Sequence, residues 1–483
     1  MSVLARFAAA TDAIGPAVEL STPLLLIIAA LGIALLLLLI IKFRIHAFIA
    51  LLVVSIVVAI ATRIPLGDIF TLVGQGVGST MTKVALIIAL GAILGRLIEL
   101  SGGVQSLADH FTDLLGPKRV AIALTIVAFL VAIPVFFEVG VIVLVPIIYA
   151  FSKVNGFHPI KFGLPMVGIM LTVHVVMPPH PGIVAGAGIF GADIGLVTLV
   201  ALPICIVLGF LCYWIASIMN RREYALSPSV AAQIAELGQG STVITTTDKN
   251  GNVMAPPRAG LIIALVAIPI VQILVGTVGS LMIEEGTFAH GLFVFIGTPV
   301  FALLVAVAIA YFTLAVRRGW GKDRTNEAFE TAMPPIASIL LVVAGGGIFG
   351  QVLQSSGIGG ALAEALDGLG VPLILLGFVV SLVLRAAQGS ATVAIVTTGG
   401  LLSAAVLGGD FSALQIALIT VAVGFGSLGL SHVTDAGFWV VTRYLGLTVA
   451  DGLRTWTVLT TLLGLAGFAL TWLVWGITAG IGA

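Results

Sequence analysis

A sequence repeat with a spacing of 255 residues most constrains how this chain folds. Residues 91–95 (Gly-Ala-Ile-Leu-Gly) return at 346–350 as Gly-Gly-Ile-Phe-Gly, and the Ser-Gly and Leu-Ala pairs that follow each copy keep the same spacing. A polar break that ends at Gly182 likewise has a counterpart that ends at Gly437. Duplicated hydrophobic halves with matching polar, glycine-rich interruptions are typical of secondary transporters, whose binding site lies where the repeats meet.

The composition indicates a polytopic membrane protein. Hydrophobic residues make up 60% of the chain and charged residues 9%, whereas a soluble domain carries roughly 25% charged residues. Several apolar segments are long enough to cross a hydrocarbon core of about 30 Å, at 24–41, 47–60, 196–218, 261–278 and 292–314. The first is predicted to be a retained span and not a signal peptide, because only Arg6 precedes it and no clear small-residue cleavage site is present.

The polar stretch at 220–258 divides the chain. We expect a first repeat at 1–219, a cytoplasmic linker at 220–258 and a second repeat at 259–483. The formal net charge is zero, which gives no reason to expect a nucleic-acid partner. Cys205 and Cys212 lie in an apolar helix without a metal-ligand or disulfide pattern around them, so they are predicted to be small core residues.

Loop charges predict that the two repeats are inverted. The loop after the first span is basic at 42–44 in copy one and acidic at 284–285 in copy two. The segment after the third span shows the same contrast, with Lys-Arg at 118–119 and only acidic residues at 364–367. Because positive charge marks cytoplasmic loops, equivalent loops face opposite sides of the membrane.

Each half also contains two segments that are too interrupted to be simple spans. The first pair is broken at 134–140 (PVFFEVG) and at 385–392 (RAAQGSAT), and the second at 174–182 (HVVMPPHPG) and 431–437 (SHVTDAG). Proline, glycine and ionisable groups are tolerated at membrane depth where the broken backbone is buried in protein or lines an aqueous cavity. The four breaks are therefore expected to surround the binding site.

The break after Arg385 has the composition of an anion site. A broken helix exposes amide N–H groups at the start of the next half-helix, and that end carries a positive partial charge. Gly389, Ser390 and Thr392 lie at such an end, and Arg385 adds a fixed positive charge that engages carboxylates in bidentate fashion. The alternative is that the hydroxyls cap the half-helix while Arg385 pairs with an acid inside the bundle.

Two acids and three histidines lie in the breaks. Glu138 follows two phenylalanines and is expected to be reluctant to ionise, because removal from water disfavours the charged form; Glu138 and Asp435 are the candidate proton carriers. The alternative for either acid is a permanent ion pair with Arg385. His180 and His432, which lie within the breaks, are favoured over His174 for direct function, although a lone histidine more often bonds a backbone carbonyl.

Other classes of protein fit the sequence less well. No HExxH or Cys/His cluster predicts a metal, and no cofactor is expected. The GxGxxG pattern at 186–191 follows Pro-Pro-His-Pro instead of a strand, so close helix packing explains it better than dinucleotide binding. No nucleophile–base pair or ATP-binding motif is evident, so neither an intramembrane enzyme nor a primary pump is expected.

The interrupted segments also carry a family resemblance. The sequence resembles the gluconate permease family of proton symporters at 134–140, 178–182, 385–394, 426–439 and 455–457. The resemblance spans nearly the whole chain and implies proton-coupled uptake of a sugar acid such as gluconate through the inner membrane of a bacterium. Two positions depart from the expected pattern, since Glu138 stands where Asp is common and Thr434 where Asn is expected. The family also includes D-serine transporters, which leaves that cargo as an alternative.

The resemblance extends to architecture through the broader ion transporter superfamily. It implies an all-α polytopic protein in the membrane lipid, forming a homodimer with a static scaffold and a sliding, elevator-type transport domain. The Glu138 and Ser390 segments would build re-entrant hairpins. Residues and resemblance together predict two sets of site residues, for substrate binding (Arg385, Gly389, Ser390, Thr392, His180 and Gly182) and for proton coupling (Glu138, Asp435 and His432). The expected partners are a small organic anion and protons; a passive channel is the remaining alternative.

Overall fold

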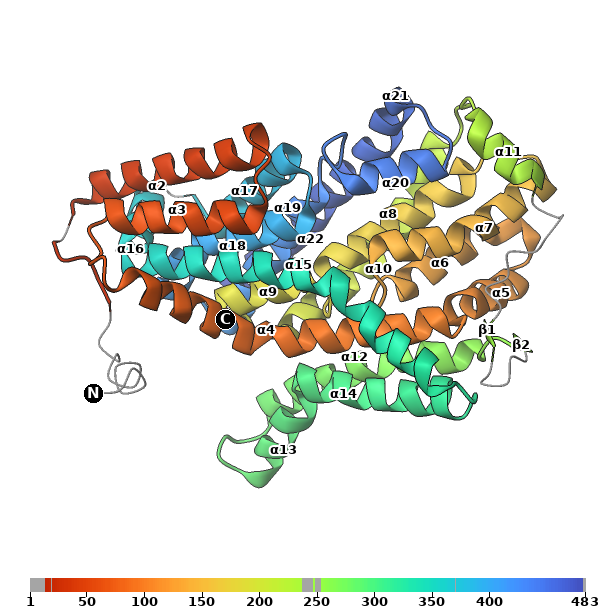
Figure 1. Ribbon diagram of the computed structural model, residues 1–483, viewed down its shortest axis with the longest axis horizontal. Helices are drawn as coiled ribbons and strands as arrows, with labels where there is room; N and C mark the ends of the chain where they lie inside the picture. The colour runs from red at the N-terminus through yellow and green to blue at the C-terminus, as the bar shows by residue number, and fades with distance from the viewer. Residues whose placement is uncertain (1–13, 19, 237–245, 248–252, 370, 481–483) are drawn as a thin grey trace.

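The structure, a computed structural model, describes residues 14–18, 20–236, 246–247, 253–369 and 371–480 (Figure 1). Within these ranges ten helices are long and apolar enough to cross a membrane. The only β-structure described is the antiparallel pair β1 (Thr246–Thr247) and β2 (Val253–Met254). The predicted all-helical polytopic architecture is confirmed. Arg6 and parts of the predicted linker, 237–245 and 248–252, lie outside the described residues.

The helices follow one another in two series. The first series is α2 (Thr22–Leu37), η1 (Leu38–Lys42), α3 (Ala47–Ala61), α4 (Ile69–Leu100), α5 (Gly103–Leu115), η2 (Pro117–Arg119), α6 (Val120–Val131), α7 (Phe137–Asn155), α8 (Ile160–Val176), α9 (Pro181–Phe190), α10 (Ile194–Met219) and α11 (Pro228–Glu236). The second is α12 (Ala259–Met282), α13 (Phe288–Gly297), α14 (Pro299–Ala310), η3 (Tyr311–Val316), α15 (Lys322–Ser355), α16 (Ile358–Leu369), α17 (Leu373–Gln388), α18 (Ala391–Gly408), α19 (Ala413–Leu428), α20 (Ala436–Tyr444), α21 (Val449–Gly452), η4 (Leu453–Thr457) and α22 (Val458–Gly480).

Helix boundaries keep the spacing of the sequence motifs. The long helices α4 and α15 end at Leu100 and Ser355, which are 255 residues apart. The short helices α9 and α20 begin at Pro181 and Ala436, again 255 residues apart. The order long helix, amphipathic helix and two interrupted segments therefore occurs twice in the described chain.

The two series interlock along the pair α4 and α15, which pack against each other over much of their length (Figure 1). Glycines permit this close approach, because a Cβ at Gly347 would lie 2.6 Å from the carbonyl oxygen of Gly76. Helix α6 packs on α8, and α17 packs on α19. The half-helices cross between the series, since α7 contacts α20 and α18 contacts α9.

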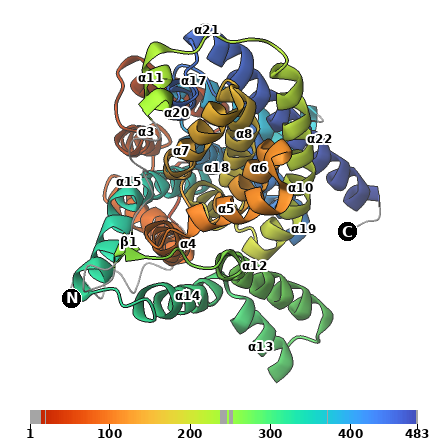
Figure 2. The same ribbon diagram turned by 90° about the vertical axis from the view of Figure 1, so that its right-hand side faces the viewer.

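Two predicted spans differ from the structure. The run at 47–60 lies in α3, which has 15 residues and is not among the ten helices long enough to cross a membrane. The apolar run at 292–314 predicts a continuous helix, but the structure divides it into α13 and α14 at Thr298 and Pro299. Proline has no N–H to continue the helical ladder and disfavours helical geometry at the preceding residue, and Thr298 has ψ 124°. Helices α12, α13 and α14 form a separate layer beside α4, from which α13 projects (Figure 2).

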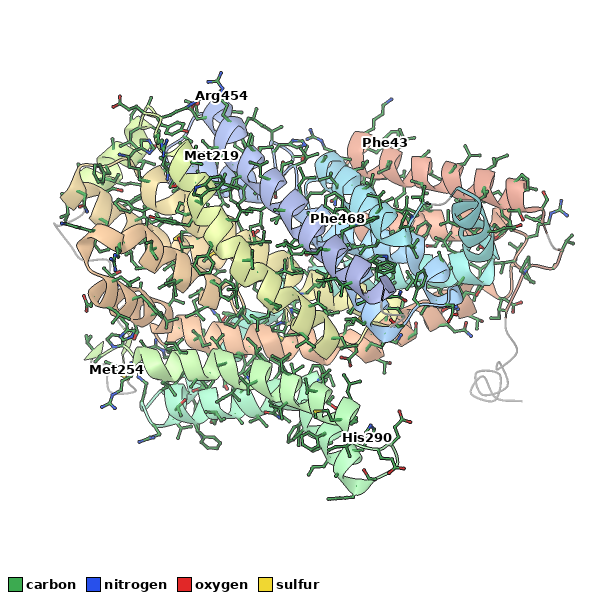
Figure 3. The ribbon with its side chains drawn as sticks, turned by 180° about the vertical axis from the view of Figure 1, so that it is seen from behind. Phe43, Met219, Met254, His290, Arg454 and Phe468 are labelled. Atoms are coloured by element: carbon green, nitrogen blue, oxygen red, sulfur yellow. The ribbon has the colours of Figure 1, made fainter. Side chains whose placement is uncertain are left out.

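The opposite face is covered by α10 and α22 (Figure 3). Phe468 of α22 stacks on Phe378 of α17, with ring centroids 4.2 Å apart. Cys205 and Cys212 in α10 are free and fully buried, which confirms their assignment as small core residues.

Candidate functional site

Of the described helices, four begin around a single cavity. The first residues of α7, α9, α18 and α20 meet at a cavity of about 130 Å³. It is lined by Phe137, Glu138, Leu171, His174, His180, Arg385, Gly389, Ser390, Ala391, Thr392, Asp435, Ala436 and Gly437. The breaks that lie far apart in the sequence thus converge, and four positive helix ends surround one volume.

The local sequence explains how one of these helix ends forms. Helix α17 stops at Gln388 because Gly389 adopts φ 83°, a left-handed conformation that favours glycine. Ser390 then caps α18, since its Oγ accepts the backbone N–H of Val393 at 3.3 Å. Helices α17 and α18 pack together as a hairpin whose tip, Gly389 and Ser390, lines the cavity.

Arg385 and Asp435 form an ion pair in this cavity. Arg385 is 2% exposed and Asp435 is 6% exposed, and guanidinium Nη2 donates to carboxylate Oδ2. Nη1 donates to the carbonyl oxygen of Gly389 at 2.6 Å. The Nε of Arg385 is buried without a hydrogen-bond partner among the described residues. In this conformation the contacts of Arg385 and Ser390 are therefore those of the structural alternative, an ion pair and a helix cap.

Asp435 is held by groups to which the sequence assigned no role. Its Oδ1 accepts the N–H of Gly437 at 2.9 Å, which caps α20. Its Oδ2 also accepts from the hydroxyl of Ser431, and the indole Nε1 of Trp456 donates to that hydroxyl at 2.7 Å. Trp456 lies in the segment 455–457 that resembles the gluconate permease family, but nothing in the local sequence links it to an acid 21 residues earlier.

The histidines are arranged differently from expectation. His180 lines the cavity and its Nδ1 accepts the N–H of Gly182 at 3.3 Å. The less favoured His174 also lines the cavity, with its ring centroid 3.6 Å from that of His180. The half-buried side chain of His432 is not among the lining groups. Gly182 lies behind Thr392, since a Cβ on it would be 3.2 Å from the Cα of Thr392.

Glu138 is an acid without an ion pair in the described structure. It lies in the first turn of α7, where helix polarity favours a negative charge, and its side chain is exposed at the cavity. The ion-pair alternative therefore applies to Asp435 and not to Glu138 in this conformation. The described residues contain no group of three His, Cys, Asp or Glu side chains arranged to hold a metal ion.

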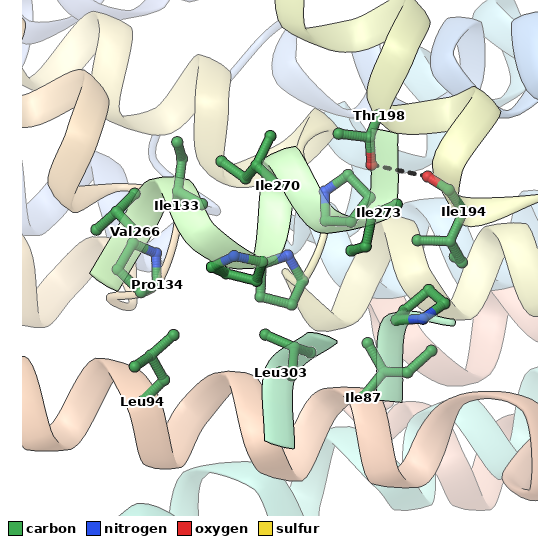
Figure 4. A pocket seen from close by; sticks show the side chains of 14 residues that line it. Ile87, Leu94, Ile133, Pro134, Ile194, Thr198, Val266, Ile270, Ile273 and Leu303 are labelled. Atoms are coloured by element: carbon green, nitrogen blue, oxygen red, sulfur yellow. Dashed lines mark hydrogen bonds between the residues drawn. The ribbon is translucent and has the colours of Figure 1, made fainter. Parts of the chain in front are cut away.

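A neighbouring apolar cavity lacks the features of an anion site. It is lined mainly by prolines and aliphatic side chains, and Figure 4 shows Leu94 and Leu303 on the side of it opposite Ile270. The hydroxyl of Thr198 donates to the carbonyl oxygen of Ile194 at 2.7 Å and is already satisfied. Its volume of about 20 Å³ accommodates about one water molecule.

The chain is similar in sequence to known membrane permeases. The chain matches the family described as GntP family permease over residues 24–477. It is 49% identical over 458 residues to the inner membrane permease YgbN of Escherichia coli (strain K12), covering 95% of this chain and 100% of that protein. It is 36% identical over 450 residues to a gluconate permease of Bacillus subtilis (strain 168), covering 92% and 97%.

A solved structure supports the fold. The YdaH transporter of Alcanivorax borkumensis aligns with a TM-score of 0.50 at 15% identity, covering 84% of this chain and 88% of that one. Similarity at this level shows the fold alone. Together, these matches and the membrane-length helices show that the chain belongs to the GntP family of permeases, as a multi-pass transporter of the bacterial inner membrane.

Proposed function

We propose that this chain is a secondary transporter that carries gluconate or a related sugar acid together with protons. The observation that carries the proposal is the convergence of four helix N-termini on a cavity with a buried arginine. Amide ends and a guanidinium both favour an anion. The cargo named for the Bacillus subtilis relative, gluconate, is a small carboxylate with several hydroxyls.

In the proposed complex the substrate carboxylate competes with Asp435 for Arg385. The unpartnered Nε of Arg385 and the amide end of α18 are the donors available to it. Thr392, Ser390 and His180 then form hydrogen bonds with the hydroxyl groups of the substrate. Gly182 and Gly389 allow the backbone segments around the substrate to approach closely. Binding therefore exchanges one carboxylate for another at the same guanidinium.

This exchange also supplies a route to proton coupling. A buried charge that loses its partner is strongly unfavourable, so Asp435 displaced from Arg385 is expected to take up a proton. Glu138, beside it in the cavity, is the second proposed carrier. A role for His432 remains a prediction. Coupling requires that proton and substrate each favour the other's occupancy.

The decisive experiment uses purified protein in liposomes with a pH-sensitive dye in the lumen. Gluconate is added outside at a clamped membrane potential in the absence of sodium, in parallel with D-serine. Acidification by gluconate in the wild type, and its loss in Arg385→Gln but not in Arg454→Gln, is the expected result. Entry of labelled gluconate without acidification would refute proton coupling. That result would favour a passive channel.

A zwitterionic cargo is the second candidate. It is favoured by Glu138, a cavity-facing carboxylate without an ion pair among the described residues, because this group can receive an ammonium. Acidification by D-serine alone would select this candidate and retain the mechanism.

The domain organisation belongs to the same proposal. We infer two inverted repeats, at 1–219 and 259–483, joined by a cytoplasmic linker at 220–258. The spacing of helix boundaries and the opposite loop charges support this division. An elevator-type movement of the hairpins against a scaffold follows from the family resemblance.

A further inference from the structure

A larger cavity lies along the same two half-helices, beyond the candidate site. It has a volume of about 650 Å³ and is bounded by α7, α20 and the linker helix α11. Its walls include Tyr149 of α7, Ser229 and Gln233 of α11, and Trp439 and Arg443 of α20. We call this space the linker-side cavity.

The linker-side cavity and the candidate site share both of their long walls. On α7, Glu138 faces the site while Ile142 and Tyr149 line the linker-side cavity. On α20, Asp435 caps the site end and Arg443 lies eight residues further, which is about 12 Å along a helix. The indole Nε1 of Trp439 donates to the carbonyl oxygen of Val433 at 2.9 Å. One half-helix pair therefore connects the two spaces.

The charge of the linker-side cavity is positive. Arg443 is exposed and forms no ion pair with any described residue; its guanidinium carbon lies 6.0 Å from the ring centroid of Trp439. No acidic side chain is among the described lining groups.

The remaining walls suit a polyhydroxylated molecule. The hydroxyls of Ser227 and Ser229 are 3.3 Å apart, and Gln233 adds an amide on the same helix. Tyr149 donates its hydroxyl to the carbonyl oxygen of Tyr444 at 2.8 Å, which ties α7 to the end of α20. An aromatic ring, several hydroxyl groups and one unpaired guanidinium form the chemistry that recognises a sugar acid.

We propose that the linker-side cavity is a second anion-binding station for the transported carboxylate, with Arg443 as its charged group. The station lies under the predicted cytoplasmic linker, so it receives substrate released from the Arg385 site before the substrate reaches the cytoplasm. This inference rests on the proposed function for the identity of the anion. The positive character of the cavity stands on its own geometry.

The test places a thiol in the cavity by the substitution Ser229→Cys in the full-length purified protein. Native Cys205 and Cys212 are fully buried, so the unsubstituted protein serves as the blank. Rates of modification are measured with an anionic and a cationic methanethiosulfonate of similar size. One unit charge about 7 Å away changes the local concentration of a monovalent ion roughly threefold in water. Each rate is divided by the rate of the same reagent with a small free thiol, because the attacking thiolate is itself negative and reacts faster with a cation. After this normalisation the anionic reagent is expected to react several-fold faster than the cationic one.

Two arginine variants, each combined with Ser229→Cys, then test the assignment. Arg443→Gln is expected to reduce the anionic preference at least threefold, whereas Arg454→Gln, at an exposed arginine outside the cavity (Figure 3), leaves it unchanged. Millimolar gluconate is expected to slow modification of the thiol both with the native Arg385 and in the Arg385→Gln variant. In Arg443→Gln, gluconate is expected to slow it much less. Equal normalised rates for the two reagents, or protection by gluconate that depends on Arg385 but not on Arg443, would overturn the proposal. Retained anionic preference without gluconate transport would contradict the proposed cargo and support the station.

Discussion

At the scale of single residues, the energetics of the site depend on one buried ion pair. Arg385 and Asp435 are nearly inaccessible, and both carry additional hydrogen bonds from or to the backbone. Such a pair contributes little net stability relative to apolar side chains, but removal of one partner costs about 3–5 kcal/mol. In the proposed complex, a substrate carboxylate that replaces Asp435 avoids that cost at Arg385, and a bound proton avoids it at Asp435.

Arg385→Gln is expected to reduce initial gluconate uptake at least about 100-fold. Loss of a buried, hydrogen-bonded charge in a binding site costs about 2–5 kcal/mol, and about 1.4 kcal/mol corresponds to a tenfold change. Uptake is measured in proteoliposomes and normalised to the protein incorporated. Arg454→Gln is the matched control for loss of an arginine, since Arg454 is exposed. Undiminished transport by Arg385→Gln would show that the anion does not bind there.

Ser390 and Thr392 are expected to respond differently to loss of the hydroxyl. Ser390→Ala removes the cap of α18 and is expected to lower stability by about 1 kcal/mol. Thr392→Val retains the shape of a side chain for which no described hydrogen bond exists, so its Tm is expected to stay unchanged while KM rises about five- to tenfold through a lost substrate contact. Thermal unfolding and uptake kinetics on the same preparations separate the two effects. A Ser390→Ala variant as stable as the wild type would contradict the role of Ser390 as a helix cap. A Thr392→Val variant with the wild-type KM would contradict the role of Thr392 in substrate binding.

At the scale of elements, broken helices are what place a polar site inside an apolar protein. At each break a proline or glycine ends one helix, and a second helix begins a few residues later. The first amide N–H groups of that second helix have no hydrogen-bond partner within it. Two of these starts come from helical hairpins and two from short half-helices. The resulting cavity is polar because of the backbone, and Arg385 adds the only guanidinium among its described lining residues.

Gly389→Ala is expected to disrupt the tip of the α17–α18 hairpin. A Cβ there would lie 2.1 Å from the carbonyl oxygen of Thr434, and the φ of 83° is itself unfavourable for alanine. We expect a Tm decrease of several degrees or loss of folded protein, as measured by heating followed by size-exclusion chromatography. Gly408→Ala at the other end of α18 is the control, because a Cβ there meets nothing within 4 Å. Equal Tm values for the two variants would refute this account of the tip.

At the scale of the whole molecule, the two series of helices are equivalent in order but not in surroundings. In α18, 72% of the residues are buried inside the protein, whereas in the most apolar 18 residues of its counterpart α7 the buried share is 50%. In the inverted-repeat organisation that we propose, such a difference in surroundings lets one fold adopt two conformations that open to opposite sides.

A homodimer is expected from the family resemblance. Light scattering of the detergent-purified protein, corrected for bound detergent, should give twice the chain mass of 49.6 kDa. Helix α13 has no buried residue in the single chain and exposes Phe288 and Phe295. A variant in which a short loop replaces α13 between α12 and α14 tests whether this layer contributes to dimer formation. A protein mass of one chain at all concentrations would contradict the dimer.

Particular residues show how much was predictable. The breaks at Gly182 and Gly389 were found in the sequence because proline, glycine and polar residues interrupt an apolar helix locally. Their convergence was inferred from the repeat alone, and the structure places Arg385, Gly389, Ser390, Thr392, His180, Glu138 and Asp435 around one cavity. His174, which the sequence favours less than His432, lines the cavity because the last turn of α8 brings its ring centroid to 3.6 Å from that of His180. His432 is not among the lining groups, and its role stays a prediction. The break at Pro299 was missed because the apolar run continues across it.

By itself, the sequence determined that this is a membrane transporter with two related halves and four interrupted helices. Those properties depend on composition, hydrophobic length and residues that end helices, all of which act within a few positions along the chain. Only the tertiary structure decided that Asp435 and not Glu138 pairs with Arg385, that Ser431 and Trp456 hold that acid, and that Arg443 faces a second cavity. Such pairings depend on which helix faces meet across tens to hundreds of residues, and local propensity carries no information on that choice.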